Sequence, residues 1–335
     1  MRQKKWKGRN LWPLLYGIVL TGYAVFTLLD AFVIPRRLVS WEQISAEDSL
    51  HSQNAPSASM PPEAEQVFSE QPEPSDDPAA EGPTESEAIP SEPIITDNSY
   101  TSDTITITIQ TLERYDTRVY VADVVLRDAA CLRTAVANGT FGRNVRSLTS
   151  EMAVENNAIL AVNGDYYGFR DSGFVMRQGY LYRDEAQQGT DYEDLVIYAD
   201  GLLEVVMESQ SDAAALAEAG AVQIFSFGPG LIQNGEITVT EDSEVGRSMA
   251  SNPRTAIGQI EPLHYILAVS DGRIEESAGL SLLELAQVMS ELGCRTAYNL
   301  DGGGSSTMWF MGKIINHPSD SWGERSVSDI VYVGY

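Results

Sequence analysis

Residues 298–308 of the chain read YNLDGGGSSTM. The stretch places one carboxylate, Asp301, at the end of an apolar run and follows it with three glycines and three hydroxyl-bearing residues. Glycines lack a Cβ, so their backbone N–H groups can approach an anion closely, and the hydroxyls add further donors. Because apolar segments flank the stretch on both sides, it predicts a loop that binds a polar ligand, with a plain turn as the structural alternative.

Two other apolar runs end in the same way, with an aspartate beside a glycine. The three runs are residues 158–162, 265–269 and 297–300, and the acids that follow them are Asp165, Asp271 and Asp301. Each run predicts a short buried strand, although Asp-Gly by itself is also a common turn. Sheet ligands tend to lie beyond the carboxyl ends of strands, so we expect these ends to converge on one site.

Helical patterns alternate irregularly with these strands. Residues 281–292 and 147–155 carry apolar side chains at helical spacing, which predicts two helices that face the core. Strands and helices mixed in irregular order are typical of the α+β class. We therefore expect one α+β domain built around a mixed β-sheet with flanking helices.

The N-terminal region predicts a membrane anchor. Residues 1–10 carry five basic side chains, and residues 11–34 form a 24-residue apolar stretch whose only charge is Asp30. At about 1.5 Å per residue this stretch is long enough to cross a bilayer. The positive-inside rule then predicts a cytoplasmic tail at 1–10, a single-pass transmembrane helix at 11–34 in the cell membrane, and an extracytoplasmic C-terminal domain. A cleaved signal peptide is the alternative.

The next segment has a composition that does not fold. Residues 42–97 contain fourteen acidic side chains, nine prolines and no lysine or arginine, so residues 35–99 are expected to form a disordered stalk. The domain is expected at residues 100–335, which carry 33 acidic and 15 basic side chains. Nucleic acid is excluded as a partner, because phosphate-backbone binding needs a basic face.

Several other kinds of site are absent from the sequence. The three histidines lack the spacing of metal ligands, and neither a nucleophile elbow nor a zinc-protease motif occurs. Cys131 and Cys294 are far apart in sequence, and both a disulfide and two buried thiols remain open. Tyr166 follows Asp165 directly, and an aromatic ring beside a carboxylate suits a sugar as well as a core.

At these residues the chain resembles the phosphodiester glycosidase family, the bacterial relatives of the uncovering enzyme that removes N-acetylglucosamine from a phosphomannose diester. The resemblance covers residues 122–333 and is carried by six short motifs, at residues 163–168, 227–229, 253–258, 270–273, 299–307 and 324–327. It implies cleavage between the anomeric carbon of a sugar and the phosphate oxygen, which gives a free sugar and a phosphate monoester. The implied substrate is a phosphoglycan or another sugar-1-phosphodiester, and no cofactor is required.

Roles follow from this chemistry as hypotheses. The expected catalytic residues are Asp301, Asp165 and Arg254: a carboxylate faces the oxocarbenium-like state, and the arginine stabilises charge on the phosphate. The expected substrate-binding residues are Asn163, Tyr166, Asp271, Gly302, Gly303, Gly304, Ser305, Ser306 and Arg325.

Two rival functions remain open at the level of sequence. In the first, Asp165, Asp271 and Asp301 hold Ca²⁺ or Mg²⁺ and the protein is a phosphodiesterase that cuts the P–O bond. In the second, the same loop binds a surface polysaccharide without turnover. The sequence leaves undecided which sugar and which phosphate-linked group are bound, whether the anomeric configuration is retained, whether a metal is needed, and how the chain oligomerises.

Overall fold

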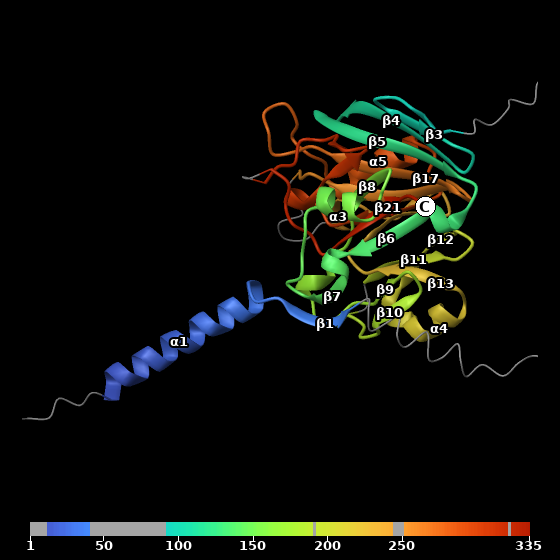
Figure 1. Cartoon of the computed structure of the whole chain (residues 1–335). Helices are drawn as coiled ribbons and strands as arrows, with labels where there is room; N and C mark the ends of the chain where they lie inside the picture. The colour runs from blue at the N-terminus through green and yellow to red at the C-terminus, as the bar shows by residue number, and fades with distance from the viewer. Residues whose placement is uncertain (1–11, 41–91, 190–191, 244–250, 321–322) are drawn as a thin grey trace, which may run out of the picture.

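The computed structural model describes residues 12–40, 92–189, 192–243, 251–320 and 323–335. Stacked β-sheets form most of the domain, and α1 (Trp12–Phe32) projects away from it (Figure 1). A smaller sheet with α4 (Ala213–Glu218) forms the lower end of the view in Figure 1.

The largest sheet has nine strands. In spatial order they are β15 (Glu236–Ile237), β14 (Gly230–Gln233), β18 (Thr296–Leu300), β16 (Thr255–Glu261), β17 (His264–Ser270), β5 (Thr117–Leu126), β4 (Ile105–Arg114), β3 (Ser99–Thr101) and β2 (Ile94–Ile95). The strands predicted at 265–269 and 297–300 are confirmed as β17 and β18.

Two five-stranded sheets and one two-stranded pair complete the architecture. The sheet that faces the nine-stranded one has the order β20 (Lys313–Ile314), β19 (Met308–Phe310), β8 (Leu160–Asn163), β21 (Asp329–Val333) and β6 (Leu132–Val136). The sheet beside α4 has the order β10 (Tyr180–Arg183), β9 (Val175–Arg177), β13 (Ala221–Phe225), β11 (Glu193–Tyr198) and β12 (Leu203–Met207). The pair is β1 (Arg36–Ser40) with β7 (Thr140–Arg143).

Alternation along the strands explains how the two larger sheets pack. On β8, Leu160 and Val162 point into the main core between the sheets, and Ala161 points the other way, toward α3 (Thr149–Glu155). The outer face of the nine-stranded sheet is covered in the same way by α5 (Leu282–Glu291). The result is a four-layer arrangement of helix, sheet, sheet and helix, which confirms the α+β class.

The start of α5 is fixed locally by its sequence. The Ser281 hydroxyl accepts the backbone N–H of Glu284 at 3.1 Å, and the Glu284 carboxylate accepts the Ser281 N–H at 2.8 Å. Such a capping box stabilises a helix by about 1 kcal/mol. Both predicted helices are confirmed, since α3 and α5 lie within residues 147–155 and 281–292.

The direction of the strands differs from the expectation of a mixed sheet. Neighbouring strands in the described part of the sheets run antiparallel, including β16 with both β17 and β18. Because β17 and β18 are each antiparallel to the strand between them, their carboxyl ends still lie at one edge. The rule for ligands at the carboxyl ends of parallel strands therefore predicted the correct sheet edge, although β17 and β18 do not pair with each other and are both antiparallel to β16.

Only part of the N-terminal expectations falls on residues that the structure describes. Within the described residues, no helix combines the length and hydropathy that crossing a bilayer requires, so the transmembrane helix expected at 11–34 is not supported. The boundary expected at residue 100 falls inside ordered structure, because β2 pairs with β3 and β3 pairs with β4. Most of the expected stalk, residues 41–91, lies outside the described residues. Cys131 and Cys294 are both free and buried.

Candidate active site

A cavity of about 220 Å³ opens where β8 and β18 end. Five of the residues predicted for the site line it: Asp165, Tyr166, Asp301, Ser305 and Arg325. They come from two facing sheets and from the loop before β21, so folding brings together side chains that are far apart in sequence. Its small size suits one sugar ring rather than an oligosaccharide.

Asp301 is the carboxylate at the mouth of this cavity. It follows the last residue of β18, its backbone N–H donates to the Gly164 carbonyl at 3.1 Å, and its Oδ1 accepts the Gly302 N–H at 2.9 Å. Burial raises the pKa of Asp301 to about 6, against the lowering effects of the Ser305 hydroxyl and the charge of Arg325. A carboxyl group with this pKa is ionised at neutral pH and still holds a proton readily, as acid–base chemistry requires.

Each of the three glycines after Asp301 stands where a Cβ would meet a neighbouring residue. A Cβ on Gly302 would lie 2.9 Å from the Pro253 carbonyl oxygen, whereas Gly303 and Gly304 face the guanidinium groups of Arg273 and Arg325. A Cβ on Gly303 would lie 3.2 Å from Nη2 of Arg273, and a Cβ on Gly304 would overlap the Arg325 guanidinium. Gly303 and Gly304 therefore leave room for positive charge beside the loop, which is the environment that binds a phosphate.

Arg254 is held firmly at the start of β16. It is 5% exposed, its backbone N–H donates to the Ser270 hydroxyl at 2.9 Å, and its Nε donates to the Leu280 carbonyl at 2.8 Å. The register of β16 places Thr255 opposite both Val269 and Leu300, so Arg254 lies between the ends of β17 and β18. Arg254, expected to be catalytic, is not among the residues that line the cavity and lies next to Gly302 of the loop.

Asn163 and Ser306 tie the two sheets together behind the site. The Asn163 amide donates to the Asp301 carbonyl at 2.6 Å, and its Oδ1 accepts the Thr255 hydroxyl at 2.8 Å and the Thr307 N–H at 3.1 Å. The Thr255 hydroxyl also lies 3.2 Å from the Ser306 hydroxyl. Asn163 is fully buried and Ser306 is 1% exposed, so these two residues position the loop. Both were expected to bind substrate, but neither is among the residues that line the cavity.

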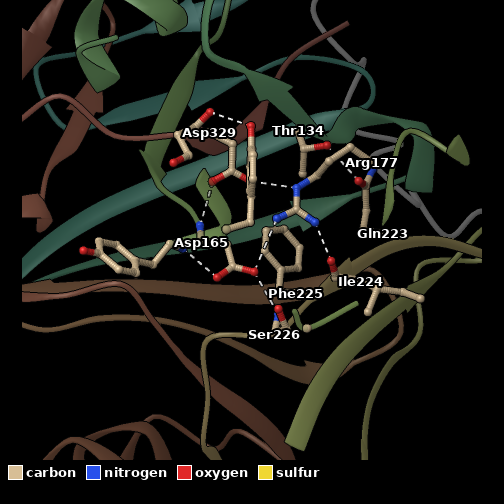
Figure 2. A network of polar contacts seen from close by, with 12 residues as sticks. Thr134, Asp165, Arg177, Gln223, Ile224, Phe225, Ser226 and Asp329 are labelled. Atoms are coloured by element: carbon tan, nitrogen blue, oxygen red, sulfur yellow. Dashed lines mark hydrogen bonds and ion pairs between the residues drawn. The ribbon is translucent and has the colours of Figure 1, made fainter. Parts of the chain in front are cut away.

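Asp165 belongs to a buried charge network that the sequence did not reveal. Figure 2 shows Arg177 between Asp165 and Asp329. Arg177 donates through Nε to Asp329 at 2.6 Å, and its Nη2 lies 3.6 Å from Asp165 Oδ2. The Asp165 oxygens also accept the N–H groups of Tyr166 at 2.6 Å and Ser226 at 2.8 Å. Asp165 lines the cavity, but its carboxylate oxygens are already engaged by Arg177 and by the backbone N–H groups of Tyr166 and Ser226.

The network is sealed inside the protein. Arg177 is 1% exposed, its guanidinium lies 4.0 Å from the centre of the Phe225 ring, and its Nη1 donates to the Ile224 carbonyl (Figure 2). Asp329 accepts the Asp165 N–H at 2.7 Å. Burial raises the pKa of Asp329 to about 6, although the charge of Arg177 lowers it. Removing one partner of such a buried group typically costs about 3–5 kcal/mol.

Asp271 lies at the same sheet edge but outside the residues that line the cavity. It is fully buried and its carboxylate accepts the Tyr120 hydroxyl at 3.1 Å and the His317 N–H at 2.7 Å. In the described part of the chain, no group of three histidine, cysteine or acidic side chains is arranged to hold a metal ion. The three acids of the metal hypothesis have separate partners instead of sharing one point.

Some residues of the cavity were missed by the sequence reasoning. Arg146 lines the wall, with its guanidinium 5.7 Å from the centre of the Phe169 ring, and Phe169 stacks on Tyr166 at 4.6 Å. Arg146 stands in a loop without a motif, so nothing local marked it. Arg177 and Asp329 did carry a signal, because each is a charged residue attached to an apolar strand.

Comparison with known proteins agrees with this geometry. A family model described as phosphodiester glycosidase matches residues 156–334. An uncharacterised prophage-derived protein of Bacillus subtilis, YomE, is 32% identical over 200 residues, which cover 58% of this chain and 31% of that protein. Mouse N-acetylglucosamine-1-phosphodiester alpha-N-acetylglucosaminidase is 27% identical over 230 residues, which cover 62% of this chain and 43% of the mouse protein.

A solved structure shares the fold. The catalytic domain of the zebrafish N-acetylglucosamine-1-phosphodiester alpha-N-acetylglucosaminidase, auto-inhibited by its pro-peptide, aligns with a TM-score of 0.56 and 23% identity, over 69% of this chain and 83% of that one. Because the family model covers more than half of the 335 residues, the chain belongs to the phosphodiester glycosidase family, a family of hydrolases. The chain spans less than half the length of the curated relatives that it matches.

Proposed function

We propose that this protein hydrolyses the anomeric C–O bond of a sugar-1-phosphodiester and releases a free sugar and a phosphate monoester. The observation that carries the proposal is the loop at residues 301–305, where one carboxylate with a raised pKa stands beside two glycines, Gly303 and Gly304, that each leave room for an arginine guanidinium. A carboxylate for the sugar carbon and guanidinium groups for the phosphate are the two parts that this reaction needs.

The roles of the residues follow from their positions. Tyr166, stacked on Phe169 in the wall of the cavity, packs against the apolar face of the sugar ring. Arg325 and the backbone of the glycine loop bind the phosphate, which already leaves readily as a monoester and needs charge stabilisation more than a strong acid. Asp301 faces the anomeric carbon, as nucleophile or as base for water. Asp165 and Arg254 hold this arrangement in place from behind.

The biological setting is proposed from the sequence. Basic residues ahead of an apolar stretch at 11–34 are also the pattern of an export signal, and they favour a position of the domain outside the cytoplasm. The substrate there is a cell-surface glycan or exopolysaccharide with sugar-1-phosphodiester links. Protection of the domain from protease added to intact cells would contradict this location.

Product analysis tests the proposed activity. The full chain is incubated with an N-acetylglucosamine-1-phosphodiester, with and without EDTA, and Asp301→Asn serves as the inactive control. Free sugar with a phosphate monoester, formed equally in EDTA, supports the proposal. Sugar-1-phosphate that disappears with EDTA would establish the metal phosphodiesterase instead. Tight binding of the diester without any product would establish a binding module.

A further inference from the structure

A second polar cluster stands at the same sheet edge as the glycine loop and has no part in the roles given above. His317 contacts Asp271 twice, through its backbone N–H at 2.7 Å and through Nδ1 at 3.0 Å. The Tyr120 hydroxyl lies 3.1 Å from Asp271 Oδ2 and 3.0 Å from His317 Nδ1. Asp271 is fully buried, yet the His317 side chain is 64% exposed. The buried carboxylate therefore fixes the orientation of an imidazole that faces solvent.

The cluster is connected to both sides of the glycine loop. Asn316, the neighbour of His317, donates to the Ser306 carbonyl at 2.9 Å and accepts the Met308 N–H at 2.8 Å. On the other side, Ser270, the neighbour of Asp271, accepts the Arg254 N–H. The cluster is thus connected, through its chain neighbours Asn316 and Ser270, to Ser306 of the loop and to Arg254.

The sheet gives the spacing between the cluster and the proposed catalytic carboxylate. Asp271 follows β17 and Asp301 follows β18, with β16 as the single strand between them. Neighbouring strands are about 4.8 Å apart, so the two strand ends are separated by about 10 Å along one edge. A sugar bound at Asp301 and a phosphate bound over the loop bring the group beyond the phosphate to this distance.

We infer that His317, oriented by Asp271 and Tyr120, binds the group esterified to the phosphate on the side away from the cleaved sugar and sets the preference of the site for that group. The inference rests on the proposed function, because it assumes a phosphodiester across the loop. It assigns a specificity role to a histidine that the sequence left without one.

The chemistry of the cluster favours a hydroxyl-rich group. With Nδ1 held by the Asp271 carboxylate, Nε2 on the exposed side of the ring is left to hydrogen-bond a hydroxyl of the ligand. Beside it, the Arg118 side chain is 32% exposed, lies 3.9 Å from Asp271 and adds further donors. The accessible atoms are thus polar, and no large apolar side chain among the described residues of the cluster offers a surface for a lipid tail.

The test compares two substrates and two histidines in the full chain. The substrates are N-acetylglucosamine-1-phosphate esterified to methanol and the same sugar phosphate esterified to the 6-hydroxyl of a hexose. The variants are His317→Phe and, as a matched control, His264→Phe. His264 also pairs with an aspartate, Asp123 at 2.9 Å, but it stands at the opposite end of β17.

We expect His317→Phe to raise KM for the hexose diester about tenfold, to leave KM for the methyl diester within twofold, and to leave kcat unchanged for both. His317→Gln, which keeps a polar group, falls between wild type and His317→Phe, and His264→Phe matches wild type. Equal effects of His317→Phe on both substrates, or no effect on either, would overturn the inference while the activity stands. Failure of the wild-type protein to release sugar from either diester would overturn the proposed function itself.

Discussion

Two carboxyl groups of this protein, Asp301 and Asp329, have their pKa raised to about 6 by burial, yet they stand in different surroundings. Asp301 lines a cavity, beside glycines whose missing side chains admit arginines. Asp329 is sealed behind it, bonded to Arg177 and to the backbone N–H of Asp165. The difference teaches that a perturbed pKa does not by itself mark a catalytic group. Access to a ligand decides which of the two can react.

The sharpest way to separate the two regions is to neutralise Asp301. Asp301→Asn is expected to lower kcat/KM by about 10³-fold or more, because the carboxylate that faces the anomeric carbon is lost. The thermal midpoint is expected to stay the same or rise, since a partly desolvated charge is removed. Steady-state kinetics and calorimetry on one preparation check both parts. Activity within tenfold of wild type would remove Asp301 from the mechanism.

The sealed network is expected to respond in the opposite way. Arg177→Met leaves Asp165 and Asp329 without their counter-charge and is expected to lower the free energy of unfolding by about 3–5 kcal/mol, measured in urea. Arg114→Met is the matched control, because Arg114 pairs with Glu291 at 2.9 Å on the surface, and it is expected to cost less than about 1 kcal/mol. Similar losses in the two variants would mean that the buried network does not hold the fold.

The glycine loop is expected to be sensitive to a single methyl group. Gly304→Ala places a Cβ on the Arg325 guanidinium, so the arginine must leave the loop and KM is expected to rise about tenfold. Gly235→Ala is the control for an added methyl group without a neighbour, since Gly235 stands in open space at the β14–β15 turn, although its φ of 85° strains an alanine there. It is expected to lose about 1 kcal/mol of stability with KM unchanged. An unchanged KM in Gly304→Ala would argue against phosphate binding by Arg325.

The smallest expected effect is that activity rises while stability falls as the pH increases. Asp301 acts in its ionised form, so kcat/KM is expected to rise as the pH increases through about 6. Both carboxyls have a pKa of 3.8 in the unfolded chain and about 6 in the fold, so the folded protein binds more protons between these values. Their contribution to stability therefore falls as the pH rises through that window.

Thermal midpoints across this range, with Asp301→Asn beside wild type, check the sign. The variant is expected to lose less stability than wild type as the pH rises. A steeper loss in the variant would contradict the raised pKa of Asp301.

Much of the site was visible in the sequence because its signals are local. The run of residues 298–308, the apolar runs and the helical spacing of residues 281–292 depend on neighbours in the chain, and they gave the strands, the α5 helix and the central loop correctly. The predicted convergence of the three acids holds for Asp165 and Asp301, which line one cavity, whereas Asp271 stands at the same sheet edge outside that lining.

The remainder depends on contacts between residues distant in the chain. The Arg177–Asp329 bond joins residues 152 positions apart, and the cluster of His317 with Tyr120 and Asp271 joins three separate elements. No local pattern encodes such partners. For the same reason Asn163, whose motif indicated a substrate contact, proved to be fully buried behind Asp301.

The most direct test of the central claim is the position of bond cleavage in water enriched in ¹⁸O. Hydrolysis of an N-acetylglucosamine-1-phosphodiester by the full chain is followed by mass spectrometry of the phosphate monoester. Cleavage of the anomeric C–O bond, as proposed for Asp301 and the glycine loop, leaves the phosphate monoester without ¹⁸O. Incorporation of one ¹⁸O atom into the phosphate would mean that water attacks phosphorus, and would contradict the account.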